Sequence, residues 1–203
     1  MHEILNPKSA TLSTKQIRMT KIQIKKTINC TTVVLCIFLA NCAATVSQNY
    51  QLGAEALNNS NYDEAIGYFT AHLKSKPDDA DAHLKLGLAY LKKESLNEAI
   101  DEFKKSVALN QDKTAALSTI KQGIMEKVAH YSDQGKTEVA MRYLTAHLAV
   151  NPDDLDTHIL LARAFIKIGS TRNALLSLNK AVALDPKNPE VIELLDYFAD
   201  GFH

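Results

Sequence analysis

The sequence predicts an all-α fold: an αα-superhelix of about four helix hairpins followed by a C-terminal capping helix. Hydrophobic residues make up 46% of the 203 residues, whereas glycine and proline, with seven and five residues, are few. Apolar residues also recur at helical spacing, as in Leu117, Ile120 and Ile124. The chain repeats itself with a period of 34 residues, the size of a two-helix unit.

Residues 1–42 form a leader that differs in charge from the rest of the chain. They carry six Lys or Arg and one acidic residue, whereas residues 43–203 carry 17 basic and 22 acidic side chains. A basic stretch followed by an apolar run from Thr31 to Ala40 is typical of a secretory signal. Because the run is about half as long as a membrane-spanning helix, a cleaved signal is favoured over a retained anchor. Translation starting at Met19 is a further hypothesis, since the basic stretch begins there.

The end of the leader, Leu39-Ala40-Asn41-Cys42, resembles the lipobox of bacterial lipoproteins, although Asn41 departs from the small residue usual before the cysteine. The resemblance implies that Cys42 is lipidated and anchors the exported protein to a membrane. The residue after the cysteine is Ala43 and not Asp, which resembles the signal for delivery to the outer membrane. The anchored protein would then face the periplasm. The alternative is a signal cut further on, which would release a soluble periplasmic protein.

The repeats follow the leader and can be aligned on one another. Offsets of 34, then 41, then 34 residues relate Leu52-Gly53 to Leu86-Gly87, Phe69 to Phe103, and Ala65 to Ala99, Ala140 and Ala174. These residues resemble the tetratricopeptide repeat pattern over residues 46–188, which implies two antiparallel helices in each unit. The units are expected at residues 46–79, 80–113, 114–154 and 155–188, with a capping helix and tail at 189–203.

The 41-residue offset adds seven residues near Asp112 to Ser118, almost two helical turns. The first helix of the third unit is therefore expected to be lengthened. Helices are expected at 48–58, 62–75, 79–93, 96–109, 113–133, 136–149, 155–167, 171–184 and 189–199. In the last helix, Val191, Leu194, Leu195 and Phe198 are expected to cover the open end of the stack.

Small residues and acidic pairs explain how each unit is built. Gly53 and Gly87 should let the two helices of a unit approach closely. The opposing small surface is expected to come from the repeated alanines of the second helices, Ala65, Ala99, Ala140 and Ala174. The pairs Asp78-Asp79 and Asp153-Asp154 follow helix-ending prolines and are expected to cap the next helix.

A longer internal repeat relates residues 68–91 to residues 143–166 at an offset of 75, which indicates duplication of a two-unit block. Through it, His72 and His83 recur as His147 and His158. Duplication explains this recurrence without a metal ion, and such residues fit half-buried positions between helices. No metal site is therefore expected.

Several function classes are disfavoured. The sequence has no HExxH, GxSxG or Gly-rich phosphate-loop motif, so we expect no enzyme activity and no cofactor. All three cysteines lie in the leader, which excludes a disulfide framework in residues 43–203. The net charge of −5 in that part also disfavours nucleic acid as a partner.

Recognition of a protein or peptide partner is the remaining class. In the tetratricopeptide family the first helix of each unit lines a concave groove, and helical register gives its positions here. They are Tyr50, Leu57, Leu84, Leu88, Leu91, Lys92, Met125, Ala129, Ile159, Arg163, Ile166 and Lys167. A groove this apolar suits an amphipathic helix with acidic flanks, and not the carboxylate clamp of chaperone-binding relatives. The alternative is that some of these side chains complete the packing between helices.

The leading hypothesis is therefore a non-catalytic scaffold or adaptor of the bacterial cell envelope. Anchored by lipidated Cys42, it would recruit a protein partner during assembly of an envelope or export complex. The alternatives are a soluble periplasmic repeat module and an accessory subunit of an enzyme or secretion complex.

Overall fold

The computed structural model describes residues 48–199, and every regular element in that range is a helix. The predicted leader, including Cys42, lies outside the described residues. After a first helix at residues 48–58, the helices are α2 (Tyr62–Ser75), α3 (Ala80–Lys92), α4 (Leu96–Leu109), α5 (Lys113–Asp133), α6 (Thr137–Val150), α7 (Leu155–Lys167), α8 (Thr171–Leu184) and α9 (Pro189–Ala199). The all-α repeat fold is confirmed, and the expected helix bounds differ from the observed ones by one residue in α3 and α6.

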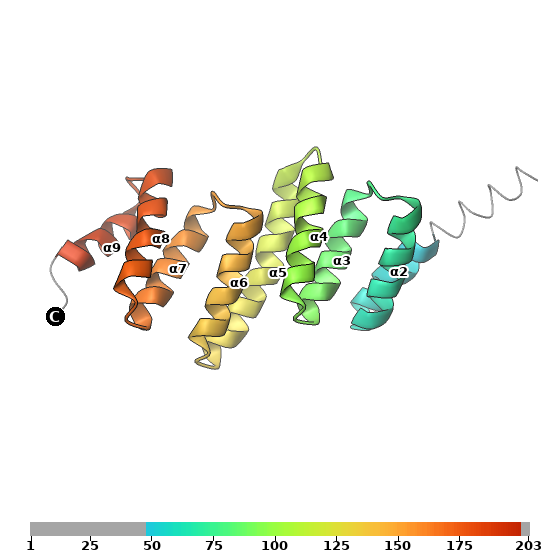
Figure 1. Ribbon diagram of the computed structural model, residues 1–203, viewed down its shortest axis with the longest axis horizontal. Coiled ribbons are helices and arrows are strands. Elements are labelled where there is room, and N and C mark those ends of the chain that lie inside the picture. The colour runs from blue at the N-terminus through green and yellow to red at the C-terminus, as the bar shows by residue number, and fades with distance from the viewer. Residues whose placement is uncertain (1–47, 200–203) are drawn as a thin grey trace, which may run out of the picture. The chain divides into compact units, whose positions relative to one another are not determined.

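The helices are arranged as consecutive antiparallel hairpins. Helices α3 and α4, α5 and α6, and α7 and α8 pack against each other, and Figure 1 shows the helices following one another in chain order. Helix α3 also contacts α5, and α4 contacts α6. The first helices of the hairpins therefore form one layer and the second helices another.

The turn inside each hairpin has the same backbone conformation in all four units. One residue has a left-handed φ, and the next amide donates to the carbonyl five residues earlier, as in Asn61 N to Ala56 O at 2.8 Å. The left-handed residues are Ser60, Glu94, Gly135 and Gly169, with φ of 62°, 65°, 71° and 73°. Two units thus place a residue with a side chain where the other two have glycine.

Replacing Ser60 with glycine is expected to raise the free energy of unfolding by about 0.5–1 kcal/mol, because a left-handed φ strains a residue that has a Cβ. Urea denaturation of Ser60→Gly against wild type checks this. Glu94→Gly should gain less, because the Glu94 carboxylate accepts from Tyr131 and from Lys127. A destabilised Ser60→Gly protein would contradict the explanation.

The acidic residues after the prolines act as helix caps. Asp79 accepts from Ala82 N at 3.1 Å, and Asp154 accepts from Thr157 N at 3.0 Å. The second aspartate of each predicted pair is thus the cap, and it also opposes the positive end of the helix that follows.

The small-residue positions correct one expectation about the core. A Cβ on Gly53 would lie 3.0 Å from the ring of Phe69, and one on Gly87 would lie 2.6 Å from the ring of Phe103. The glycines therefore accommodate a buried phenylalanine of the second helix, and the alanines are not their main opposing surface. At the same repeat positions the third unit has Val128 with Leu144, and the fourth has Ala162 with Leu178.

Helix α5 has 21 residues, against 13 in α3 and α7. Its Ile120 and Ile124 are fully buried in a core cluster with residues of α3, α4 and α6. A Cβ on Gly123 would lie 3.1 Å from Leu88, so glycine allows α5 to pack closely on α3. The long helix thus joins the second unit to the third.

Helix α9 covers the last hairpin with only part of its apolar surface. Val191 and Leu194 are buried in a cluster with Ile159 and Leu178, and Phe198 packs against that cluster. Leu195 is 38% exposed, so the expectation that it covers the stack is wrong. Its side chain lies on the side of α9 that no further helix of the described chain covers.

Candidate protein-binding site

The layer of first helices contains a hollow of about 380 Å³ between helix 48–58, α3 and α5. Leu57 and Leu88 line it with apolar side chains, whereas Lys92 of α3 and most of the residues that α5 contributes are polar. The lining residues are Leu57, Ser60, Tyr62, Leu88, Lys92, Thr119, Gln122, Gly123 and Glu126. We refer to these nine residues as the concave groove.

One ion pair crosses the concave groove. Lys92 Nζ donates to both carboxylate oxygens of Glu126, at 2.7 and 2.8 Å. The lysine ammonium holds the pKa of the Glu126 carboxyl below its usual range. The groove therefore presents a bound charge pair beside apolar surface, and acidic and basic groups on a partner would both find a counterpart there.

The predicted groove residues do not all lie in the groove. Leu57, Leu88 and Lys92 line it. Leu84, Leu91 and Ile159 have exposed fractions of 9%, 0% and 3%, so the prediction that they face a partner is wrong. Their side chains are part of the core clusters, which is the packing role that the sequence left open.

The other predicted residues mostly have contacts within the chain. The Tyr50 hydroxyl donates to Asp81, and Arg163 donates to Glu190 and Glu193 of α9 at 3.2 and 3.1 Å. Met125 and Ile166 are partly buried against core clusters, whereas Ala129 and Lys167 are exposed. Lys92 and Arg163 are thus paired within the chain, although the sequence suggested that they contact acidic flanks of a partner.

Sequence reasoning missed the contribution of α5 to the concave groove. It selected Met125 and Ala129, whereas Thr119, Gln122 and Glu126 line the hollow. Gly123 was the available signal, because a glycine within an apolar helix marks close approach to a neighbouring helix.

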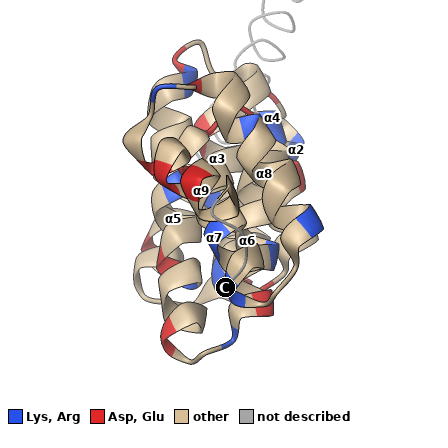
Figure 2. Ribbon diagram, turned by 90° about the vertical axis from the view of Figure 1, so that its left-hand side faces the viewer, with Lys and Arg blue, Asp and Glu red and all other residues tan. Residues whose placement is uncertain are grey.

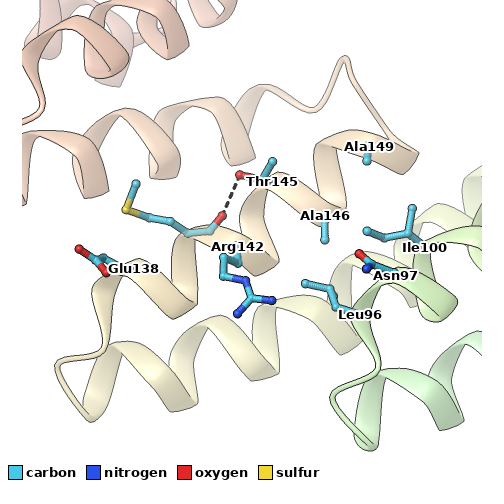
Figure 3. A pocket seen from close by; sticks show the side chains of 9 residues that line it. Leu96, Asn97, Ile100, Glu138, Arg142, Thr145, Ala146 and Ala149 are labelled. Carbon is cyan, nitrogen blue, oxygen red and sulfur yellow. Dashed lines mark hydrogen bonds between the residues drawn. The ribbon is translucent and has the colours of Figure 1, made fainter.

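A second hollow, of about 430 Å³, lies between the second helices α4 and α6 (Figure 3). The side chains that line it come from both helices and include Leu96, Asn97, Ile100, Glu138, Met141, Arg142, Thr145, Ala146 and Ala149. The Thr145 hydroxyl donates to the backbone carbonyl of Met141 at 2.9 Å. No sequence signal pointed to this site.

Comparison with known proteins identifies the repeats. Tetratricopeptide repeat family models match residues 50–113 and residues 131–195, which together make up more than half of the chain. The chain is a tetratricopeptide repeat protein. The two matches fall on the two halves of the described array and leave most of α5, residues 114–130, between them.

Relatives of this tetratricopeptide repeat protein include eukaryotic proteins of much greater length. The cell division cycle protein 27 homolog of Caenorhabditis elegans is 30% identical over 168 residues, which cover 70% of this chain and 21% of that protein. The DnaJ homolog subfamily C member 3 of Homo sapiens is 30% identical over 149 residues, covering 68% and 30%. Superkiller protein 3 of Schizosaccharomyces pombe is 29% identical over 123 residues, covering 61% and 8%. The chain thus spans less than a third of each relative.

Solved structures similar to the tetratricopeptide repeat protein include MamA and a protein from Parabacteroides merdae. The crystal structure of MamA is 22% identical, with a TM-score of 0.40 over 74% of this chain and 85% of that one. The tetratricopeptide repeat protein from Parabacteroides merdae is 13% identical, with a TM-score of 0.40 over 74% of this chain and 57% of that one.

Four histidines of the repeats are buried between helices. His72 Nε2 lies 2.8 Å from Asp79 Oδ2, and both ring nitrogens of His83 face oxygen atoms. Among residues 48–199 no three or more His, Cys, Asp or Glu side chains are grouped as metal ligands. His83 and His158 each contact the carbonyl oxygen of the proline that ends the preceding repeat, Pro77 and Pro152.

Buried His147 predicts a pH-dependent stability. The side chain is fully buried, and its Nε2 lies 3.7 Å from Asp154 Oδ2 without a hydrogen bond. Burial lowers the pKa of His147, nearby Lys121 lowers it further, and Asp154 opposes both. Since folding favours the neutral ring, the unfolded chain binds the extra proton below about pH 6.5, and stability falls as the pH falls.

We expect this histidine to contribute a slope of up to about 1.4 kcal/mol per pH unit to the free energy of unfolding as the pH falls below about 6.5. His147→Ser should flatten the slope, because the second unit has buried Ser106 at the same repeat position. Urea denaturation at several pH values measures the slope. His130→Ser, at an exposed position, should leave the slope as it is in wild type.

Charge is mixed along the described chain. Figure 2, which views the end of the array at α9, shows acidic and basic residues interspersed along the ribbon. Within the described residues, no helix is long and apolar enough to cross a membrane.

Proposed function

We propose that the chain is a non-catalytic adaptor of the bacterial cell envelope that binds a protein partner in its concave groove. Membership of the tetratricopeptide repeat family supports a protein-interaction scaffold in general. The hollow between the first helices, with exposed polar groups beside Leu57 and Leu88, is the observation that carries the assignment to this face.

An amphipathic helix is the partner that suits the concave groove best. Leu57 and Leu88 offer an apolar strip, while the Lys92–Glu126 pair places both signs of charge beside it. A helix that buries its apolar face here and forms ion pairs with Lys92 and Glu126 would match both features. Arg163 is held by α9, so the groove that we propose ends before the fourth unit.

Export rests on the leader alone. A basic stretch, a short apolar run and the lipobox-like Leu39-Ala40-Asn41-Cys42 support secretion with lipidation of Cys42, so that the array faces the periplasm from a membrane. Assembly of an envelope or export complex is the process in which such an anchored adaptor would act.

Photo-crosslinking in the producing bacterium tests the binding face. A photoreactive phenylalanine analogue at Gln122, an exposed groove residue on α5, should give a discrete crosslinked product with one protein. The same analogue at Lys104, exposed on α4 in the other layer, is the matched control and should give none. Crosslinking from Lys104 but not from Gln122 would place the partner on the wrong side for this proposal.

A blocking variant gives the second arm of the test. Thr119→Arg introduces a long charged side chain into the concave groove at an exposed helix position and should abolish the crosslink from Gln122. Circular dichroism should remain helical, which separates loss of binding from loss of fold. An undiminished crosslink would show that the partner bypasses the groove.

Intact-mass measurement tests the membrane anchor. Wild-type protein should begin at Cys42 and carry the mass of its acyl chains, whereas Cys42→Ala should remain unlipidated. A mature protein that begins after Ala44 would support the soluble periplasmic alternative instead.

A further inference from the structure

A third hollow, of about 350 Å³, lies among α6, α7 and α8, away from the concave groove. Its lining residues are Leu148, Pro152, Asp153, His158, Lys180, Ala183 and Leu184. Each has the identical residue 75 positions earlier in the chain, at Leu73, Pro77, Asp78, His83, Lys105, Ala108 and Leu109. The duplicated two-unit block has therefore built the same surroundings twice.

In the first copy, a carboxylate of the chain itself lies among these residues. One oxygen of Glu102 lies 2.5 Å from His83 Nδ1, and the other accepts from Lys105 Nζ at 2.7 Å. His83 Nε2 lies 2.8 Å from the carbonyl oxygen of Pro77. Each ring nitrogen of His83 therefore has an oxygen atom within hydrogen-bond distance.

In the second copy the carboxylate is missing. Ser177 stands at the position equivalent to Glu102, while the histidine and the lysine are retained. His158 Nε2 keeps its contact with the Pro152 carbonyl at 2.8 Å. His158 is 8% exposed, and its buried Nδ1 has no hydrogen-bond partner. A buried nitrogen without a partner is costly unless a ligand supplies one.

We propose that the hollow beside His158 binds a carboxylate that enters from outside the chain and takes the place of the missing Glu102 group. One oxygen of the ligand accepts from His158 Nδ1, which takes up a proton from solvent as the ligand binds. The other oxygen accepts from Lys180, as Glu102 accepts from Lys105. The site is independent of the concave groove, and the proposal goes beyond the adaptor function.

The hollow favours a small singly charged group. Its volume of about 350 Å³ admits a short side chain or a small monocarboxylic acid. Asp153 also lines the hollow, and its negative charge disfavours anions with more than one charge, such as phosphate. Aliphatic surface from Leu148, Ala183 and Leu184 suits a ligand with an apolar stem.

Nitrogen NMR of the histidine rings, with acetate as the probe, tests the proposal. In wild type, acetate should move the His158 Nδ1 signal saturably toward the imidazolium position, while chloride at equal ionic strength should not. Ser177→Glu restores the arrangement of the first copy and should abolish the acetate response, because a carboxylate of the chain then occupies the place of the ligand. No saturable shift in wild type, or the same shift in Ser177→Glu, would overturn the proposal.

A converse variant keeps the test decisive if Ser177→Glu does not fold. Glu102→Ser opens the first copy, so His83 should gain an acetate response that it lacks in wild type. Lys180→Met in the second copy should weaken the response of His158 by about tenfold or more, because it removes the second donor. A His83 without response in Glu102→Ser would contradict the assignment.

Two short peptides identify the source of the carboxylate. One is acetylated and amidated with a single internal glutamate, and the other is acetylated tri-alanine with a free C-terminus. A response to either peptide assigns the site to that kind of protein carboxylate, and a response to acetate alone assigns it to a free small acid. If none of the three probes shifts His158, the hollow is not a carboxylate site.

Discussion

Replacing Gly87 with valine is expected to lower the free energy of unfolding by about 3 kcal/mol. A Cβ at this position would lie 2.6 Å from the fully buried ring of Phe103 and 3.3 Å from the carbonyl oxygen of Ala99. Neither group is free to move, because the ring is enclosed and the oxygen belongs to the helix backbone. The two helices must separate or the ring must leave its rotamer, and either change opens gaps in the core. Chemical denaturation measures the loss.

The third unit supplies the compensating change. It has Val128 and Leu144 at the positions of Gly87 and Phe103, so the smaller side chain on one helix faces the larger one on the other in both units. Gly87→Val with Phe103→Leu should be more stable, by about 1–2 kcal/mol, than the sum of the two single changes predicts. Strict additivity would show that the two positions do not share space.

Ile124→Ala should cost about 3–4 kcal/mol, because Ile124 is fully buried in the cluster that joins α3, α4, α5 and α6. In a repeat array, stability depends on the interfaces between neighbouring units. Loss of packing at this junction should therefore uncouple the first two units from the last two. Relative to wild type, the rate of hydrogen exchange should increase more in α5 and its neighbours than at either end of the array.

The matched control for this prediction lies two residues away on the same helix. Gln122→Ala changes an exposed side chain of α5 and should alter stability by less than about 0.5 kcal/mol. A similar loss in both variants would mean that the helix itself, and not the buried cluster, limits stability.

The sequence predicted the fold closely because the signals for helices are local. Acidic caps such as Asp79 and Asp154, prolines after the second helices and a repeated turn all mark helix ends within a few residues. The length of α5 also follows from an insertion of nearly two turns that preserves the buried face.

The site was predicted less well because it depends on how each helix is rotated about its axis and on contacts between residues that are far apart in the sequence. Leu84 and Leu88 lie one turn apart on α3, yet only Leu88 reaches the concave groove. The ion pairs of Arg163 with Glu190 and Glu193 depend on where α9 packs, and no local sequence pattern specifies that position. The duplication explained the recurring histidines, but the change from Glu102 to Ser177 gains meaning only when the distances around His83 are known.

Hydrogen exchange of the complex tests the central claim, that the partner is bound by the layer of first helices. With the partner recovered by crosslinking from Gln122, the account predicts slower exchange in helix 48–58, α3 and α5, where the concave groove lies. Exchange in α4 and α6 should be unchanged. Slower exchange confined to α4 and α6, around the hollow that contains Arg142, would contradict the account.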